Sequence, residues 1–147
     1  MPAGKKPEVP KKIGKLVLVA DDHRNIRNIV CFTLEKEGFG TVQASDGQGA
    51  LFALLSNKVD LILLDSAMPR IDGLEVCRTL KKDPKTRDIP IIFSTGRTDK
   101  QHVLDAIQAG AADYIVKPFA PDVLVNKVRK VLGLPVEPRE KDEPRHG

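Results

Sequence analysis

Strand-like and helix-like segments alternate five times along this chain. The strand-like runs are short and largely apolar, and they occupy residues 15–20, 40–45, 59–65, 89–95 and 112–117. A helix-like pattern follows each of them, at residues 24–38, 49–57, 72–83, 99–110 and 121–133. Strands that are apolar throughout, rather than at every second residue, are typical of a parallel sheet covered by helices on both faces. Because crossover connections are right-handed, the alternation predicts a doubly wound α/β sheet.

The apolar spacing within two of the helical patterns predicts the faces that pack on the sheet. These faces are Ile26, Ile29, Val30 and Leu34 in the first helix, and Ala50, Leu51, Leu54 and Leu55 in the second. Gly38, Gly110 and Gly133 follow the last periodic residue of their helices and are suited to C-caps. Cys31 and Cys77 lack the spacing of metal ligands, so we expect reduced thiols in the core.

The formal net charge of +4 is concentrated near the amino-terminal end. Residues 1–15 contain five lysines and one glutamate, which gives +4, whereas residues 134–147 contain three basic and four acidic residues, which gives −1. The residues between them therefore sum to about +1. We predict a basic disordered arm at 1–14, one folded domain at 15–133, and a charged, Pro-containing tail or linker start at 134–147.

Several classes of protein are excluded by composition. The chain has no run of 18 apolar residues, and its amino terminus lacks the apolar centre of a signal peptide, so we expect a cytoplasmic protein with no membrane span. Aromatic residues make up only 4% of the sequence, and no nucleic-acid-binding motif is present. We therefore expect no direct contact with nucleic acid.

Polar residues stand where four of the predicted strands end. Asp21 and Asp22 follow the first strand, Asp65 ends the third, Ser94 and Thr95 end the fourth, and Lys117 ends the fifth. In a doubly wound sheet, ligands bind at the carboxyl ends of the strands. Three carboxylates repel one another unless a cation is present, and hard oxygen ligands suit Mg²⁺. An ammonium and a hydroxyl opposite the metal supply the charge and the donor that a phosphoryl group needs.

The same residues lie in four motifs: "VADD" at 19–22, "LLDSAMPRIDG" at 63–73, "STG" at 94–96 and "AGAADYIVKPF" at 109–119. Together they resemble the receiver domain of two-component response regulators, of the chemotaxis-regulator type. The resemblance covers residues 15–133 and implies a (βα)5, flavodoxin-like fold with strand order 2-1-3-4-5. It also implies a bacterial phosphorelay protein that is a signalling switch, with self-catalysed phosphotransfer and slow autodephosphorylation, and not a turnover enzyme.

The resemblance assigns roles to the acidic residues. Asp65 resembles the phosphoacceptor, a carboxylate nucleophile that attacks a phosphohistidine or an acyl phosphate. Asp22 resembles the direct ligand of Mg²⁺ and Asp21 a ligand acting largely through water. The resemblance also makes Asp65 a ligand, bridged by Mg²⁺ to the phosphoryl group, and Ala67 the residue whose backbone carbonyl completes the protein ligands. A lone buried carboxylate is costly, so we expect Asp65 at an exposed strand end where Mg²⁺ makes its charge tolerable.

The resemblance further implies a switch. Thr95 and Lys117 resemble the pair that contacts the phosphoryl group, and Tyr114 the aromatic rotamer switch that moves inward when Thr95 shifts. Pro118 is expected to follow a cis peptide bond. Phosphorylation would be read by partners on the surface formed by helix four, strand five and helix five.

The implied partners are a histidine kinase or phosphotransfer protein, which donates the phosphoryl group, and a downstream protein target or detached output domain. The resemblance leaves open a phosphorylation-linked dimer. The sequence fits both a stand-alone receiver and the first part of a longer protein.

Other interpretations of these residues remain open at this point. Asp21 and Asp22 could cap a helix, and Ser94 could replace Thr95 as the hydroxyl. Tyr114 could be a plain aromatic at the edge of the core. For His23 and His102, a surface position and a solvated helix face are favoured over metal binding or phosphotransfer.

Two other functions fit parts of the pattern. A Mg²⁺-dependent phosphohydrolase of the haloacid-dehalogenase type needs a second acid two residues beyond the nucleophile, where this chain has Ala67. A degenerate receiver would lack an acid or the lysine, and none is missing. Ala67 and Arg97 occupy positions that tune dephosphorylation in the family, and the small Ala67 side chain favours a longer-lived phosphorylated state.

Overall fold

The structure is a computed structural model that describes residues 12–68, 73–96 and 100–136. Its elements are β1 (Leu16–Ala20), α1 (Arg24–Lys36), β2 (Gly40–Ala44), α2 (Gly47–Ser56), β3 (Leu61–Asp65), α3 (Gly73–Lys82), β4 (Ile91–Thr95), α4 (Lys100–Gln108), β5 (Asp113–Val116) and α5 (Pro121–Val131). All ten predicted elements are present. Most are a few residues shorter than the apolar patterns that predicted them, because those patterns continue into the flanking turns.

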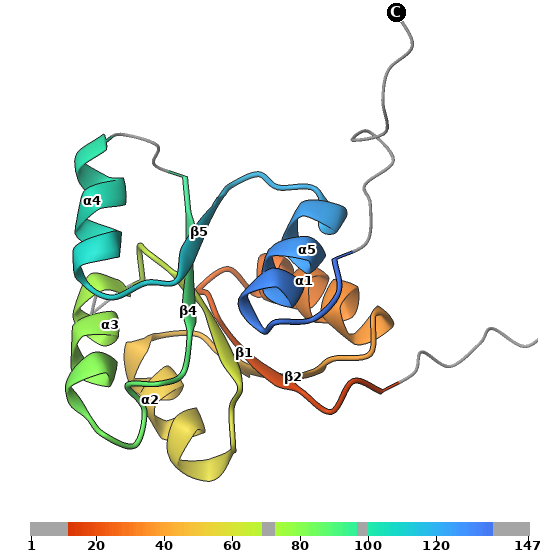
Figure 1. Cartoon of the computed structure of the whole chain (residues 1–147), viewed down its shortest axis with the longest axis horizontal. Coiled ribbons are helices and arrows are strands. Elements are labelled where there is room, and N and C mark those ends of the chain that lie inside the picture. Colours follow the sequence, from red (N-terminus) through yellow and green to blue (C-terminus); the bar gives the residue numbers. More distant parts are fainter. Residues whose placement is uncertain (1–11, 69–72, 97–99, 137–147) are drawn as a thin grey trace, which may run out of the picture.

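The five strands form one parallel sheet in the order β2-β1-β3-β4-β5 (Figure 1). This confirms the predicted doubly wound, flavodoxin-like fold. Helices α2, α3 and α4 lie on one side of the sheet, and α1 and α5 lie on the other (Figure 1). The strand order changes direction at β1, so the carboxyl ends of β1 and β3 flank the crevice in which such folds bind ligands.

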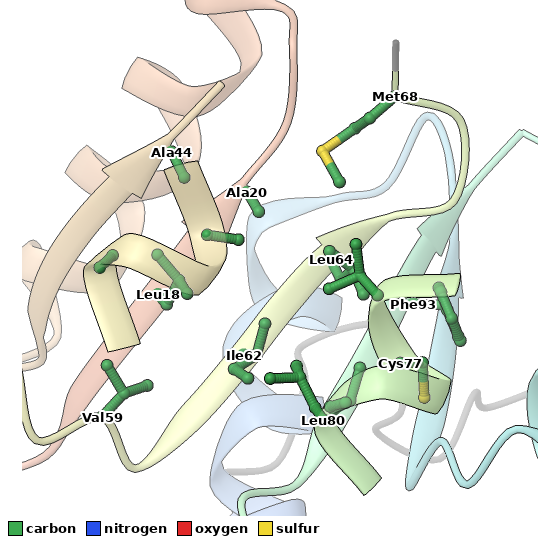
Figure 2. Packing of buried hydrophobic residues seen from close by; sticks show 14 of the residues in the cluster. Leu18, Ala20, Ala44, Val59, Ile62, Leu64, Met68, Cys77, Leu80 and Phe93 are labelled. Atoms are coloured by element: carbon green, nitrogen blue, oxygen red, sulfur yellow. The ribbon is translucent and has the colours of Figure 1, made fainter. Parts of the chain in front are cut away.

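Two buried clusters hold the three layers together, one on each face of the sheet. Alternate residues of each strand supply them: Leu18 and Leu64 pack under α2 and α3, whereas Val17 and Leu63 pack under α1 and α5. Figure 2 shows the first cluster, in which the side chains of β1, β3 and β4 meet those of the covering helices. Each large side chain buried in this way contributes about 1.5–3 kcal/mol to folding, so the sheet positions its strand ends rigidly.

The second helix packs on most of the predicted face: Ala50 is buried and Leu51 and Leu54 pack against the first cluster, but Leu55 does not. Ala50 and Ala53 are buried, whereas Leu55 is 84% exposed and Phe52 is 70% exposed. Helix α2 is apolar nearly all round, so its spacing does not select one face, and the side with small residues allows the closest approach to the sheet. Ile29 of α1 was predicted to face the core but is 63% exposed, because Val30, Cys31 and Leu34 already fill that face.

Several other local predictions can be compared with the structure. Gly38, Gly110 and Gly133 have positive φ angles, as their C-cap positions require. Cys31 and Cys77 are buried free thiols, and burial raises the pKa of both. His102 is buried rather than solvated, because it lies one turn before the buried Ala106 on the inner face of α4.

None of the described helices is long and apolar enough to cross a membrane. The predicted arm and tail lie largely outside the described residues.

Candidate functional site

The predicted strand-end residues meet at one edge of the sheet. Asp21 directly follows β1, Asp65 is the last residue of β3, Thr95 is the last residue of β4, and Lys117 directly follows β5. Because β1, β3, β4 and β5 are consecutive neighbours in a parallel sheet, these four positions share its carboxyl edge.

The acidic residues form a compact cluster. One side-chain oxygen each of Asp21, Asp22 and Asp65 and a ring nitrogen of His23 all lie within 4.8 Å of one another. Asp21 and Asp65 are each only 3% exposed, whereas the side chain of Asp22 is 33% exposed. The expectation that Asp65 stands at an exposed strand end is therefore wrong. It ends a strand that has neighbours on both sides, in a sheet with helices on both faces.

Lys117 compensates part of this buried negative charge. Its Nζ atom lies 2.9 Å from Asp21 Oδ2, to which it donates a hydrogen bond, and 3.4 Å from Asp65 Oδ1. Burial alone would lower the pKa of Lys117, but the hydrogen bond to Asp21 and the charge of Asp65 outweigh it and raise the pKa above its ordinary value. Lys117 is therefore a fixed cation within this cluster.

For Asp65, burial outweighs the groups that stabilise its charged form, which is the reverse of the situation at Lys117. Burial and the nearby charge of Asp21 raise its pKa above the ordinary carboxyl value, although the Ala67 N–H and Lys117 favour its ionised form. The Ala67 N–H donates to Asp65 Oδ1 at 3.2 Å. The ionised carboxylate is thus under-compensated in the protein alone.

The donor set fits a magnesium ion. Asp21, Asp22 and Asp65 bring three negative charges to the cluster and Lys117 brings one positive charge, so a divalent cation would balance the remainder. Carboxylate oxygens are the ligands that Mg²⁺ prefers. A cation bound there would favour the ionised form of Asp65, whose pKa is raised by burial and by the charge of Asp21. The roles of individual residues as metal ligands, including the Ala67 carbonyl, stay predictions.

The loop after β1 is held by contacts that the sequence pattern does not predict. His23, and not Asp21 or Asp22, is the N-cap of α1, and its side chain makes no capping hydrogen bond to any described residue. Its backbone N–H instead donates to Asp21 Oδ1 at 2.8 Å. The alternative in which the two aspartates merely cap the helix is therefore wrong. Arg27 Nη1 also donates to the Asp21 carbonyl at 2.8 Å, a role that no local pattern distinguishes from a surface arginine.

Both candidate hydroxyls lie at the site edge. Ser94 stands opposite Asp65 in the strand register, whereas Thr95 is one residue further on and opposite Val116. Both residues are buried, and the Lys117 N–H donates to the Thr95 carbonyl at 2.7 Å. The choice between the two hydroxyls stays a prediction in favour of Thr95.

The remaining switch residues lie on β5 and beyond it. Tyr114 is half-buried against the cluster shown in Figure 2, and its ring centroid is 5.7 Å from Lys127 Nζ. A hollow of about 390 Å³ between β5 and α5 is lined in part by Tyr114, Phe119 and Lys127. The Lys117–Pro118 peptide bond is cis, as the resemblance implied. Arg97 falls outside the described residues.

Gly73 is a site-positioning residue that the motif alone did not single out. A β-carbon at Gly73 would lie 2.6 Å from the Asp65 carbonyl oxygen, 2.9 Å from Ser66 Cα and 3.0 Å from the Phe93 ring. Two of these neighbours are backbone atoms of the strand end, which cannot move without displacing Asp65. Helix α3 can therefore begin this close to β3 only with glycine at this position.

We expect Gly73→Ala to lower the free energy of unfolding by about 1–3 kcal/mol, the usual effect of overpacking. The gain in helix propensity, about 1 kcal/mol, does not offset a clash with backbone. Urea unfolding followed by circular dichroism measures the difference. Gly96→Ala is the matched control, because a β-carbon there meets no described atom within 4 Å. Equal stabilities of the two variants would show that α3 can shift without cost.

Comparison with known proteins agrees with this geometry. The family model of the response regulator receiver domain matches residues 17–129. The chain is 39% identical over 120 residues to the phosphate regulon transcriptional regulatory protein PhoB of Pseudomonas aeruginosa, which covers 82% of this chain and 52% of that protein. It is 39% identical over 128 residues to the DNA-binding response regulator MtrA of Mycobacterium leprae, with 87% and 53% covered.

Solved structures give the same result. The chemotaxis protein CheY4 of Vibrio cholerae matches with a TM-score of 0.77 at 30% identity, covering 80% of this chain and 98% of that one. The present chain spans about half the length of the curated relatives it matches.

Proposed function

The chain belongs to the response regulator receiver domain family, and on that premise we propose that it is a phosphorylation-dependent switch that accepts a phosphoryl group on Asp65. The observation that carries the proposal is the position of Asp65 itself. It is a buried carboxylate at the end of a central strand, with Lys117 Nζ 3.4 Å from one oxygen and two further aspartates beside it. This arrangement suits a carboxylate that accepts an anionic phosphoryl group next to a bound metal cation.

The chemical step is a displacement at phosphorus. A carboxylate oxygen of Asp65 attacks the phosphorus of a phosphohistidine or a small acyl phosphate. A new bond forms between that oxygen and phosphorus, and the bond to the donor's imidazole nitrogen or carboxyl oxygen breaks, so that the donor leaves with its electron pair. A Mg²⁺ ion held there would supply the positive charge that offsets the repulsion between the anionic nucleophile and the anionic donor. Asp22 and Asp65 would hold it directly, Asp21 largely through water, and Ala67 through its carbonyl.

Lys117 and Thr95 contact the product in this proposal. Lys117 Nζ already lies near Asp65 Oδ1, so a phosphoryl group there would be within reach of its charge. The Thr95 hydroxyl would donate to a phosphoryl oxygen. A phosphoryl group adds about −1.5 to −2 charges. When Thr95 shifts toward it, the Tyr114 side chain would move inward. The readout surface consists of α4, β5 and α5.

The partners follow from the same proposal. A histidine kinase or phosphotransfer protein donates the phosphoryl group, and a downstream protein or an output domain reads the switch. The domain proposed for this role spans residues 15–133, between a basic arm and a charged tail. We place it in the cytoplasm, where such donors act, and leave a phosphorylation-linked dimer as one mode of output. The Ala67 side chain has no group to orient a hydrolytic water, so the phosphorylated state should be long-lived rather than last seconds.

The direct test is phosphorylation with a small acyl phosphate. We expect incubation with Mg²⁺ and acetyl phosphate to add the mass of one phosphoryl group, as measured by intact-protein mass spectrometry. Removal of Mg²⁺ with EDTA should prevent the addition, because the under-compensated carboxylates then repel the donor. The same amount of labelling with and without Mg²⁺ would contradict the proposed metal requirement.

A further inference from the structure

His23 contacts both aspartates of the proposed metal site. Its Nδ1 atom lies 3.2 Å from Asp21 Oδ1 and 3.1 Å from Asp22 Oδ1. The favoured prediction was a surface histidine beside the acidic pair, with no role in metal binding or phosphotransfer. The side chain is indeed 63% exposed, but its inner ring nitrogen is part of the cluster that also contains Asp65. An imidazole nitrogen and three carboxylates are therefore within reach of one cation.

The backbone fixes this arrangement. The His23 N–H donates to the same Asp21 oxygen that its ring nitrogen contacts, and the His23 carbonyl accepts from the Arg27 N–H at the start of α1. The residue is thus held at both ends of its backbone, at the junction between the β1 end and the helix. Its Nδ1 atom faces Asp21 and Asp22 because of where the chain turns.

A nitrogen ligand changes the metals that a site prefers. Mg²⁺ favours oxygen ligands and gains little from imidazole, whereas imidazole suits Co²⁺, Ni²⁺ and Zn²⁺. We propose that His23 is an additional ligand for borderline transition metals, so that this site binds Co²⁺ or Zn²⁺ much more tightly than Mg²⁺. This inference rests on the proposed metal site at Asp22 and Asp65 and deepens it. It assigns metal selectivity to a side chain of this chain that Mg²⁺ binding does not require.

The test compares Mg²⁺ with Co²⁺, which has visible absorption bands that report nitrogen coordination. Binding of each ion is measured by isothermal titration calorimetry on the wild-type chain and on His23→Ala. We expect His23→Ala to weaken Co²⁺ binding by about 10-fold or more, in line with the loss of groups that support a metal. Mg²⁺ binding should change by less than about 2-fold, because its oxygen ligands stay in place. The Co²⁺ absorption bands should also change in shape and intensity.

Two further variants separate the outcomes. His146→Ala removes a histidine from the carboxy-terminal segment and should leave both affinities and the Co²⁺ spectrum unchanged. Asp22→Asn should weaken Mg²⁺ and Co²⁺ together. If His23→Ala weakens Co²⁺ and Mg²⁺ equally, or neither, His23 is not a selective ligand, although the metal site stands. If the wild-type chain binds no Mg²⁺, or Asp22→Asn binds it normally, the proposed metal site itself is wrong.

Discussion

Asp65→Asn is expected to abolish phosphorylation by acetyl phosphate and, at the same time, to raise the stability of the metal-free protein. An amide has no nucleophilic carboxylate oxygen, so the bond to phosphorus cannot form. Asp21 and Asp22 do not substitute for it, because Asp21 is held by Lys117 and by the His23 N–H, and Asp22 lies in the loop beyond β1. We therefore expect labelling to fall to the background in mass spectrometry.

The stability gain follows from the sign of the pKa shift. Burial raises the pKa of Asp65 in the folded protein above its ordinary value, so the ionised carboxylate is less favourable in the folded state than in the unfolded chain. The folded state therefore loses stability as the pH rises from the ordinary carboxyl pKa of the unfolded chain through the higher pKa of Asp65 in the folded protein. Asparagine keeps the shape of the side chain and removes the charge. In EDTA at pH 7 the variant should have the higher melting temperature, and the difference should shrink as the pH falls below the ordinary carboxyl pKa.

Asp88→Asn is the matched control, because Asp88 is an exposed aspartate in the segment before β4. It should be labelled normally and melt within about 1 °C of the wild type, since surface substitutions change stability little. Full labelling of Asp65→Asn would show that another residue accepts the phosphoryl group. A lower melting temperature at pH 7 would show that Lys117 and the Ala67 N–H compensate the charge of Asp65 more fully than burial opposes it.

The fold and the site's main residues could be predicted because they depend on order along the chain. Continuous apolar runs such as 61–64 fix buried parallel strands, and the polar residue that ends each strand must lie at one edge of the sheet. The convergence of Asp21, Asp65 and Lys117 needs no more than this. Their burial did not follow, because it depends on how closely helices on both faces approach the strand ends.

Contacts between residues far apart in the chain could not be predicted. Lys117 was expected to contact the phosphoryl group, and the sequence gives no sign that without one it bonds to Asp21, 96 residues away. The contact of His23 with the carboxylates of Asp21 and Asp22 depends on one local turn. The sequence shows that the three residues are adjacent, but adjacency alone does not distinguish a metal ligand from a surface histidine. Gly73 stood within a recognised motif, yet only the distances to the β3 backbone explain why glycine is needed there.

Lys117→Met should have opposite effects on stability and on metal affinity. Methionine has a similar length but no charge, so Asp21 and Asp65 lose their nearest cation. Removing one partner of a buried ion pair costs about 3–5 kcal/mol, and because the Lys117 side chain is 20% exposed we expect about 3 kcal/mol in EDTA. Mg²⁺ should nevertheless bind more tightly to the variant than to the wild type, because a positive charge that repels it is gone.

Urea unfolding in EDTA and in Mg²⁺, together with calorimetric titration of Mg²⁺, measures both effects. Mg²⁺ should restore more stability to Lys117→Met than it adds to the wild type, since it binds the folded state with higher affinity. Phosphorylation should still slow by about 10²- to 10³-fold, the usual effect of removing one donor that stabilises a developing charge. Lys127→Met is the control: its pair with Asp113 is more exposed, so it should lose less than about 1 kcal/mol. Weaker Mg²⁺ binding by Lys117→Met would instead mean that Lys117 holds the carboxylates in the arrangement that binds the metal.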